Sequence, residues 1–479
     1  MSYYYPRAAV KLRILPEDFQ LKSDASLQQV LEIIVQAKNV TVTVNDYKTT
    51  DTFSMDIDYK NFPFDPRTIR SCGVTIYMQD MERQQKDDGT IAELVPGAAT
   101  KLDAGLTNAV YGGFVDEETI SFDESKREVH FDGRDFTALL IDQKYQVNTP
   151  ISFNSRLDVA LTSLLANFKA TAQITVVNKT GGTLPIIASF DPAFGAPLAG
   201  MKNVGPKESY WEIIQDMVNR AGLICFIHLD QLILTTPKNQ NDSTDDIKFI
   251  YGQNVKNLTF KRKLGRFKGF NIQVRSRVGK RVLTAKIPEE ATAAWAAAFG
   301  VSRDPVQIPV LKPDGSLDTS AQHFAPYITF PVPNVGNKDQ LIRIGQTLYE
   351  QYSLQQLEGS FETTEMLGRG QTKDTTGDTR QSFTQYDLTQ IAKGQSIVLE
   401  IDTDDLAEIS RLKDVPSREQ YLIRRSYDKN VAAIFAKTMG KFSPRFQIKS
   451  YQMTINNNDG WKLKVDFQNI IDLTQRSQP

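Results

Sequence analysis

The sequence predicts a mainly β protein with α+β modules, and three observations support this class. In residues 1–145, short segments alternate apolar and polar residues at roughly ten-residue spacing, which is typical of an antiparallel barrel or sandwich. Residues 146–245 instead contain amphipathic helical stripes followed by a hairpin. Strand-like alternation then returns over residues 246–286 and 359–479. With 479 residues, the chain is long enough for about two to four domains.

The first β block, residues 1–145, contains several strands with one face in a core. Apolar residues alternate with polar ones over residues 53–59, which is the pattern of a half-buried strand. Residues 123–127 are polar and charged, and we expect them to connect two strands as an exposed hairpin turn. Gly133 is expected to end the last strand. Asp135 is expected to cap the short helix that follows, by accepting hydrogen bonds from its free N–H groups.

Residues 146–245 form the predicted α+β module. Leucines over residues 157–168 recur at the spacing of one helical face, and residues 211–221 hold a second apolar stripe. Two apolar runs within residues 223–235 then flank Asp230-Gln231, which predicts a tight hairpin.

The second β block, residues 246–286 and 359–479, is interrupted by an insertion at residues 287–358. The insertion is expected to hold two helices and a proline-rich connection, in which the prolines exclude a central strand. The block ends in a hairpin, where alternating apolar residues between Tyr451 and Phe467 lie on either side of a turn.

The composition argues against several classes of function. The 56 basic residues nearly balance 57 acidic ones, so the whole chain has no charge bias toward nucleic acid or an anionic membrane. No apolar run is long enough to span a bilayer. Only two cysteines (Cys72, Cys225) and three histidines (His130, His228, His323) occur, and none stands in a known catalytic motif. We therefore expect no catalytic residue, no metal site, no cofactor and no disulfide.

One stretch departs from the charge balance, because residues 247–288 contain twelve basic residues and no acidic one. Alternation places Arg275 and Arg277 on the outer face of their strand. A solvated sheet face, an acidic protein partner and a polyanion are the open explanations. The candidate basic cluster, which would face a partner or a channel, comprises Lys261, Arg262, Lys263, Arg266, Lys268, Arg275, Arg277, Lys280 and Arg281.

The order of the elements resembles that of a known family. A strand ends in Gly133-Arg134-Asp135 before a short helix, and a later helix holds residues 210–214 and ends in residues 220–222. After a hairpin, Tyr251-Gly252 leads into the strand Asn271–Val274. In this order the sequence resembles the baseplate hub proteins of contractile-tailed bacteriophages, which include the late-control tail proteins. That family is similar to the N-terminal half of type VI secretion spike proteins.

The resemblance implies two tail-tube-like antiparallel β-barrels, one in residues 1–145 and one in residues 246–286 and 359–479. The α+β module of residues 146–245 lies between them, and residues 287–358 are inserted into the second barrel. Three such chains would form a pseudo-sixfold ring. This ring would join the sixfold tail tube to the threefold central spike and line the channel for genome ejection.

The implied partners are two further copies in a homotrimer, the tail tube protein, a central spike protein, and the tape measure and baseplate wedge proteins. No spike-like module follows the last hairpin, so the spike is expected to be a separate protein. The implied location is the tail baseplate of a virion, assembled in the cytoplasm of a bacterial host. We expect no enzymatic activity, no membrane and no sequence-specific nucleic acid as a partner. The alternatives are a glycosidase with two carboxylates on a β scaffold and a nucleic-acid-binding module that uses residues 247–288.

Overall fold

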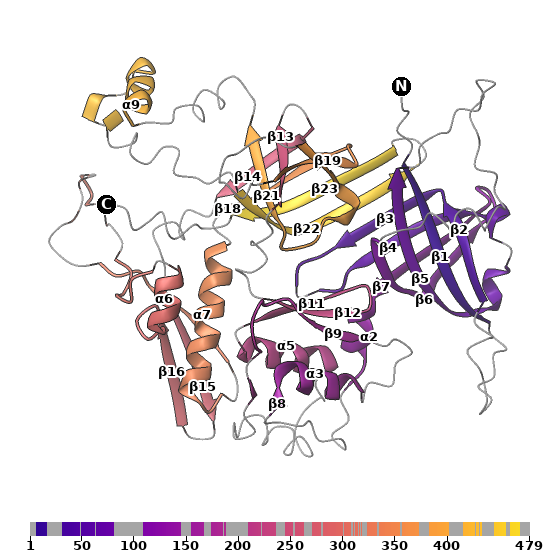
Figure 1. The fold of residues 1–479 in the computed structure, drawn as a ribbon, viewed down its shortest axis with the longest axis horizontal. Coiled ribbons are helices and arrows are strands. Elements are labelled where there is room, and N and C mark those ends of the chain that lie inside the picture. The colour runs from indigo at the N-terminus through magenta and orange to yellow at the C-terminus, as the bar shows by residue number, and fades with distance from the viewer. Residues whose placement is uncertain are drawn as a thin grey trace.

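In the computed structural model, the strands of residues 6–135 lie at one end of the long axis, and those of residues 271–287 lie toward the other (Figure 1). None of the described helices is both long and apolar enough to cross a membrane. The residues that the structure describes are 6–16, 31–47, 49–62, 64–80, 109–144, 155–166, 174–184, 186–187, 209–221, 223–235, 245–251, 254–262, 271–278, 281–299, 301–307, 310, 312–314, 316, 318, 323–332, 335–354, 357–372, 383–401, 415–426, 428–430, 432–433, 445–456 and 460–469.

The first β unit is an antiparallel sheet that curls back on itself. It comprises β1 (Pro6–Pro16), β2 (Leu31–Ala37), β3 (Asn39–Val44), β4 (Thr52–Asp58), β5 (Ile69–Asp80), β6 (Tyr111–Asp123) and β7 (Glu128–Asp135), with the 3-10 helices η2 (Tyr59–Asn61) and η3 (Pro66–Thr68). The strands lie in the order β2-β1-β5-β6-β7-β4-β3. β2 and β3, the first and last strands of this order, are separated in the chain by Lys38 alone. The N–H of Lys38 donates to the carbonyl oxygen of Asp56 (2.8 Å). Among the described residues no ladder joins β2 directly to β4, so the path is curled but not closed.

The alternation in the sequence decides which side of these strands enters the core. Phe53, Met55 and Ile57 are at most 3% exposed, whereas the polar residues between them are only partly buried. Each buried side chain removes apolar surface from water, which is the main force that holds the sheet curled. The predicted strand and its inner face are therefore confirmed.

Two details at the end of β7 differ from the prediction. Gly133 does not end the strand but lies inside it, where a Cβ would come within 2.4 Å of the Phe53 ring. Glycine suits this position because the ring and the carbonyl oxygen of Phe114 (2.1 Å from such a Cβ) occupy the space of a side chain. Asp135 precedes α2 (Phe136–Asp142) but makes no capping hydrogen bond to it; its Oδ2 accepts a hydrogen bond from Thr137 Oγ1 (2.7 Å) instead.

The α+β module packs its helices against a small sheet. Beyond α2 it comprises β8 (Ser155–Arg156), α3 (Leu157–Ala166), β9 (Thr175–Asn178), β10 (Ile186–Ile187), α5 (Tyr210–Arg220), β11 (Ile224–His228) and β12 (Gln231–Thr235). β12 lies between β11, to which it is antiparallel, and β9, to which it is parallel. The predicted helical faces are confirmed, since Leu157, Leu161, Trp211 and Ile214 are at most 5% exposed. The hairpin turns at Leu229-Asp230, one residue earlier than predicted.

The second β unit is built mainly from the C-terminal part of the chain. It comprises β13 (Asp245–Tyr251), β14 (Lys256–Arg262), β18 (Leu357–Thr363), β19 (Leu367–Thr372), β20 (Phe383–Asp387), η6 (Leu388–Gln390), β21 (Ser396–Ile401), β22 (Arg445–Asn456) and β23 (Gly460–Asn469), with α9 (Val415–Arg424) between β21 and β22. The strands lie in the order β14-β18-β23-β22-β21-β13-β19-β20. The predicted terminal hairpin is confirmed. β22 and β23 pair from Phe446 opposite Asn469 to Asn456 opposite Gly460, and alternate residues of both strands are buried.

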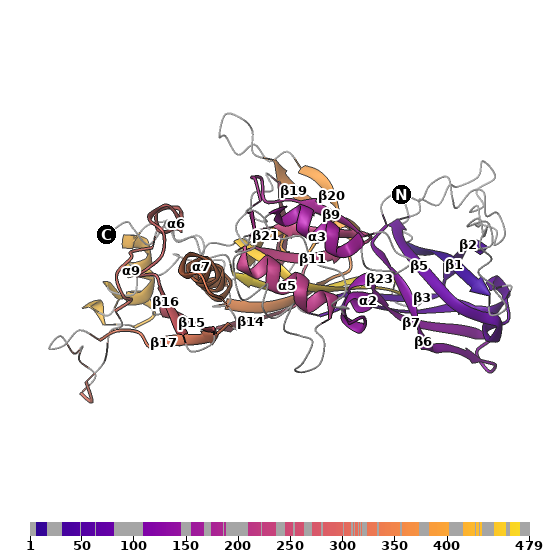
Figure 2. The same ribbon diagram turned by 90° about the horizontal axis from the view of Figure 1, so that it is seen from below.

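The inserted module is larger than the sequence predicts. It comprises β15 (Asn271–Val278), β16 (Arg281–Ile287), α6 (Ala293–Phe299), β17 (Tyr327–Pro331) and α7 (Lys338–Leu354). Residues 271–287, expected in the second barrel, form a separate sheet in the order β16-β15-β17. The reason is their own core, in which Val274 and Ile287 pack on α7 beside Gly345. Figure 2 shows α7 nearly end-on beside this sheet, and β17, whose last residue is Pro331, occupies an edge, as a proline in a strand requires.

Candidate assembly interface

The two β units join through a ladder between strands that are far apart in the sequence. β3 pairs with β22 in antiparallel register from Val44 opposite Tyr451 to Val40 opposite Ile455. The opposite edges of the same strands pair with β4 and β23, so the sheet continues through the junction without a break. The fold is mainly β with α+β modules, as predicted, and the two β units share one connected sheet.

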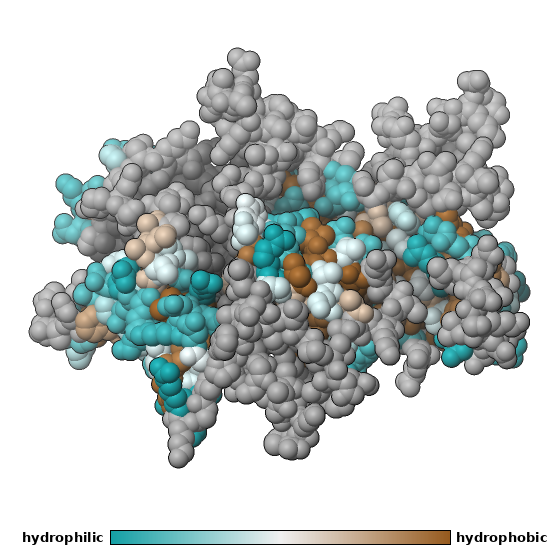
Figure 3. Space-filling view, turned by 60° about the horizontal axis from the view of Figure 1, so that its bottom comes forward, coloured by the Kyte–Doolittle hydropathy of each residue, from teal (hydrophilic) through white to brown (hydrophobic). Residues whose placement is uncertain are grey.

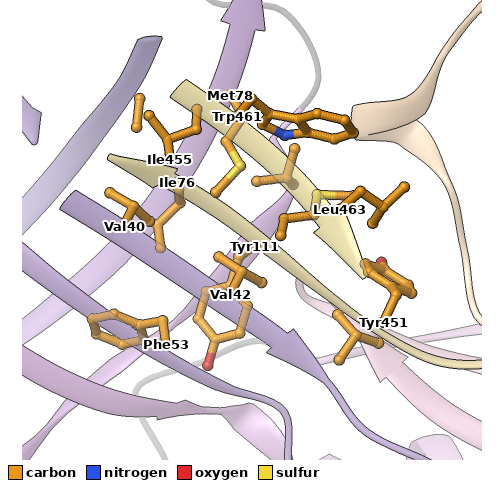
Figure 4. Close-up of a cluster of buried hydrophobic side chains, with 14 of the residues drawn as sticks. Val40, Val42, Phe53, Ile76, Met78, Tyr111, Tyr451, Ile455, Trp461 and Leu463 are labelled. Atoms are coloured by element: carbon orange, nitrogen blue, oxygen red, sulfur yellow. The ribbon is translucent and has the colours of Figure 1, made fainter. Parts of the chain in front are cut away.

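Side chains of both units fill the core beneath the junction (Figure 4). Trp461 of β23 is 1% exposed, and its Nε1 has no hydrogen-bond partner among the described residues. Its stabilising role is therefore packing. The residues labelled in Figure 4 come from β3, β4, β5 and β6 on one side and from β22 and β23 on the other: Val40, Val42, Phe53, Ile76, Met78, Tyr111, Tyr451, Ile455, Trp461 and Leu463.

The opposite face of the junction carries small uncharged polar side chains. The hydroxyl oxygens of Thr41 and Thr454 lie 3.4 Å apart across the ladder, and Gln452 Nε2 donates to Thr43 Oγ1 (3.3 Å). Cross-strand contacts of this kind fix the register of neighbouring strands. The seam between the units is thus apolar on its core face and neutral on its outer face.

On the first unit, the same outer face holds a histidine between two carboxylates. His130 Nδ1 lies 2.6 Å from Asp56 Oδ1, and His130 Nε2 lies 3.0 Å from Asp132 Oδ2. Partial burial opposes protonation of the ring, but the hydrogen bonds to Asp56 and Asp132 outweigh it, so the pKa of His130 is raised. His130 is therefore a strand residue with local partners, the role that its alternation indicates.

Replacing His130 with glutamine should cost more stability at pH 6 than at pH 8. A histidine whose pKa is raised on folding contributes fully below its unfolded pKa of about 6.5, and the contribution is lost as the pH rises through the folded value. Because the side chain is 37% exposed, solvent screening limits the difference to less than about 1 kcal/mol. Urea unfolding of both proteins at the two pH values measures it.

His228 provides a control of opposite sign. Burial, followed by the nearby charge of Lys179, lowers the pKa of His228. Its contribution to stability is lost as the pH falls, so the cost of His228→Gln should be smaller at pH 6 than at pH 8. A cost of His130→Gln that is the same at both pH values would contradict the ion pairing of His130.

A buried lysine fastens the second unit to the first. Lys393, in the turn before β21, is 6% exposed, and its Nζ donates to Asp51 Oδ1 and to the carbonyl oxygen of Asn45, both at 3.1 Å. Asp51 Oδ1 also accepts a hydrogen bond from the N–H of Asn45 (2.8 Å). Two turns, one from each unit, are thus held by a desolvated ion pair with supporting hydrogen bonds.

A second buried carboxylate lies beside this pair without a basic partner of its own. The N–H of Asp135 donates to the carbonyl oxygen of Asp51 (3.0 Å), while Asp135 Oδ1 has no hydrogen-bond partner among the described residues. Burial and the negative charge of Asp51 raise the pKa of Asp135 to about 7. Burial raises the pKa of Asp51 as well, and the positive charge of Lys393 opposes that shift.

The α+β module completes this cluster. Lys393 Nζ lies 5.4 Å from the centroid of the Phe226 ring and 6.0 Å from that of Tyr47, within the range of cation–π attraction. Gln215 Nε2 of α5 donates to the carbonyl oxygen of Tyr47 (3.4 Å). Side chains of the first β unit, the second β unit and the α+β module therefore meet around the buried ammonium group of Lys393. We call this group of side chains the Lys393 cluster.

The described members of the candidate basic cluster come from two different sheets. Lys261 and Arg262 lie in β14 of the second β unit, whereas Arg275, Arg277 and Arg281 lie in the separate sheet of the inserted module. Residues 271–287 form a sheet of their own, so the described members of the cluster are divided between two sheets, and their facing a partner or a channel stays a prediction. The remaining members, which are Lys263, Arg266, Lys268 and Lys280, lie outside the described residues.

The inserted module nonetheless has a basic outer face. Arg275 and Arg277 are exposed, and the register of β15 with β16 places Lys286 on the same face. Lys286 Nζ lies 5.1 Å from the centroid of the Tyr327 ring. The coloured surface of this module is largely hydrophilic (Figure 3). Lys286 belongs to the same basic stretch, and alternation along β16 could have placed it.

The residues that could carry metal or thiol chemistry are separated. Cys72 and Cys225 are both buried and not bridged, and burial raises the pKa of Cys72 to about 12. A thiol in this state is a poor nucleophile. Within the described ranges, no group of three or more histidine, cysteine, aspartate or glutamate side chains is placed to hold a metal ion.

With this geometry, the chain has the fold of bacteriophage tail proteins. The tail protein from Neisseria meningitidis MC58 superimposes with a TM-score of 0.50 at 13% identity, over 98% of this chain and 99% of that one. The 43 kDa tail protein of prophage MuSo2 from Shewanella oneidensis gives a TM-score of 0.49 at 12% identity, over 96% of this chain and 98% of that one.

A third structure belongs to a secretion system. A component of the Escherichia coli type VI secretion system, described as structurally similar to tail proteins of bacteriophage T4, gives a TM-score of 0.42 at 8% identity, over 96% of this chain and 77% of that one. No protein-family model and no curated protein sequence matches the chain. The resemblance to hub-like tail proteins that the sequence indicates is confirmed at the level of the fold.

Proposed function

We propose that this chain is the structural hub of a contractile-tail baseplate. Three copies, arranged head to tail, form a pseudo-sixfold ring because each chain supplies two β units. The ring joins the sixfold tail tube to the threefold central spike, and its inner wall lines the channel for genome ejection. The chain acts in the virion tail, after assembly in the cytoplasm of the bacterial host, and catalyses no reaction.

The observation that carries this proposal is the ladder between β3 and β22. A ring made of paired units needs a fixed angle between the two units of each chain, since every error in this angle accumulates around the ring. The common core around Trp461 and the ion pair of Lys393 with Asp51 both fix that angle. The fold of the Neisseria tail protein, matched along almost the whole chain, supports a place in a tail.

The partners follow from the position of a hub. They are the tail tube protein on one side, a separate central spike protein on the other, and the tape measure and baseplate wedge proteins. The neutral outer face of the junction, with Thr41, Thr43 and Thr454, suits a wall past which a charged polymer must move without binding.

The two alternative functions lose their main support in the described residues. A nucleic-acid-binding module requires the basic stretch to form one surface, and its residues instead lie on two separate sheets. A glycosidase requires a carboxylic acid and a second carboxylate that face each other across a sugar. On the first unit, Asp116 accepts a hydrogen bond from Arg134 Nε (2.9 Å), and Asp56 and Asp132 are both bonded to His130.

The decisive experiment counts and locates the chain in intact particles. An electron cryomicroscopy reconstruction of tails, with the chain tagged, should show three copies around the central axis between tube and spike. Cross-linking within particles should connect the chain to the tube protein and to the spike. Six copies, or a position in the outer wedges or fibres, would exclude the hub role, whereas a monomer in dilute solution would not.

A further inference from the structure

The Lys393 cluster holds two buried carboxyl groups and one buried ammonium group. Asp51, Asp135 and Lys393 are 6%, 5% and 6% exposed. The ammonium group donates to Asp51, whereas Asp135 Oδ1 has no hydrogen-bond partner among the described residues. If both carboxyl groups were ionised, one negative charge would be buried without compensation, and burial of such a charge is costly.

The other titratable groups around the cluster do not supply the missing positive charge. Tyr111 Oη donates to the carbonyl oxygen of Asp51 (3.2 Å), and burial raises the pKa of Tyr111, so it stays neutral. Burial also raises the pKa of Cys225 and lowers that of His228, so both are neutral near pH 7. The remaining charges that act on these groups belong to Asp46, Asp116, Arg134, Lys179 and Asp230. Of the two basic ones, Arg134 is already paired with other carboxylates, and Lys179 acts on His228.

The cluster lies where three parts of the chain join. Asp51 belongs to the turn between β3 and β4, and Asp135 is the last residue of β7, directly before α2 of the α+β module. Lys393, from the second β unit, donates to the carbonyl oxygen of Asn45. Asn45 directly follows Val44, which is the last residue of β3 and an end of its ladder with β22. The charge of the cluster therefore acts at one end of the ladder that joins the β units.

We infer that Asp51 and Asp135 hold one proton between them, and that its release to water loosens the joint between the two β units and the α+β module. In this step the O–H bond of one carboxylic acid breaks, its electron pair stays on the carboxylate, and the proton goes to water. The second carboxylate then repels that of the ion pair, with one ammonium group for both. The inference concerns a single chain and does not depend on the proposed hub function.

The joint should be tighter in mildly acidic solution than in alkaline solution. Burial and the charge of Asp51 raise the pKa of Asp135 to about 7 in the closed joint. Once water enters, a carboxyl group returns to its ordinary pKa of about 4 and is ionised throughout the range from pH 6 to pH 8. A proton that only the closed joint retains stabilises the closed joint, and this stabilisation is lost as the pH rises through about 7.

Hydrogen exchange of the purified full-length chain tests this inference, with Asp135→Asn as the variant that has no proton to release. The rates are measured by mass spectrometry at pH 6 and pH 8 on peptides that contain β3 and β22. The ratio of the wild-type rate to the variant rate cancels the intrinsic effect of pH, as well as the titration of His130 and His228. This ratio should rise about tenfold from pH 6 to pH 8, because the wild-type joint alone loses its proton.

Two further variants separate a shared proton from a general effect of charge. Asp51→Asn leaves one carboxyl group beside one ammonium group, so the buried charge is balanced at both pH values. The ratio of the wild-type rate to the Asp51→Asn rate should therefore rise to within about threefold of the Asp135→Asn result. Asp142→Asn is the matched control, because this aspartate ends α2 with its side chain 54% exposed. Its ratio should change by less than about twofold.

Infrared difference spectra of the wild-type chain detect the proton directly, even if a variant fails to fold. Between pH 6 and pH 8 the carbonyl band of one protonated carboxylic acid should disappear, and this change should be absent from folded Asp135→Asn. Circular dichroism establishes which variants fold. The inference is overturned if the wild-type spectra lack this band, if the ratio for folded Asp135→Asn is the same at both pH values, or if Asp142→Asn gives the same rise.

Discussion

Replacing Lys393 with methionine is expected to lower the free energy of unfolding by about 3 to 5 kcal/mol. Methionine fills much of the same volume, but it leaves the carboxylate of Asp51 buried without its cation. Desolvation of an unpaired charge is what makes the loss of one partner so costly. The measurement is urea or thermal unfolding of the purified protein at neutral pH.

Two further variants show that the loss comes from the unpaired charge. Lys393→Met combined with Asp51→Asn removes both charges and should recover part of the stability, because a neutral amide is cheaper to bury than a carboxylate. Asp135→Asn removes the carboxylate that has no basic partner, and it should cost much less than Lys393→Met. If Lys393→Met alone costs less than about 1 kcal/mol, the ion pair does not fasten the two units.

Replacing Trp461 with alanine should cost a similar amount, about 3 to 5 kcal/mol, through the cavity that it leaves. The ring is almost fully buried in the core shared by both β units, so its loss removes contacts on both sides of the junction. We expect the unfolding transition to broaden or to divide in two, as the units no longer unfold together. Calorimetry, compared with denaturant unfolding, detects that division.

Trp461→Phe is the matched control. Because Nε1 has no hydrogen-bond partner among the described residues, phenylalanine loses no hydrogen bond and only part of the ring volume. Its cost should stay below about 1.5 kcal/mol, the range of modest changes in core volume. If phenylalanine is as damaging as alanine, packing of the ring is not the reason for its contribution.

The sequence predicted the fold class and most of the elements because the relevant signals are local. A strand with one face in a core must alternate, and a helix on a core must repeat its apolar residues about every 3.6 positions. For that reason the sequence predicted the buried faces around Met55 in β4 and Ile214 in α5. The resemblance to hub-like tail proteins rested on the order of these elements, and the fold supports it.

The candidate site could be predicted only in part. Alternation placed Arg275 and Arg277 on an outer face, where they are exposed. It could not show that β15 and β16 form a sheet of their own, because alternation describes a strand and not its neighbour. The prediction that Gly133 ends its strand was wrong for a related reason: the groups that exclude a side chain there, the Phe53 ring and the carbonyl oxygen of Phe114, lie on other strands.

By itself the sequence determined the strands, the helices and their inner faces, since these depend on neighbours within a few residues. The tertiary structure alone decided which strands meet. Thr41 and Thr454 are 413 positions apart and face each other at the junction. Lys393 is a charged residue in a turn, yet it is buried between two units. Pairing of distant strands and burial of a charge depend on the whole arrangement of the chain, because their free energy comes from groups that only folding brings together.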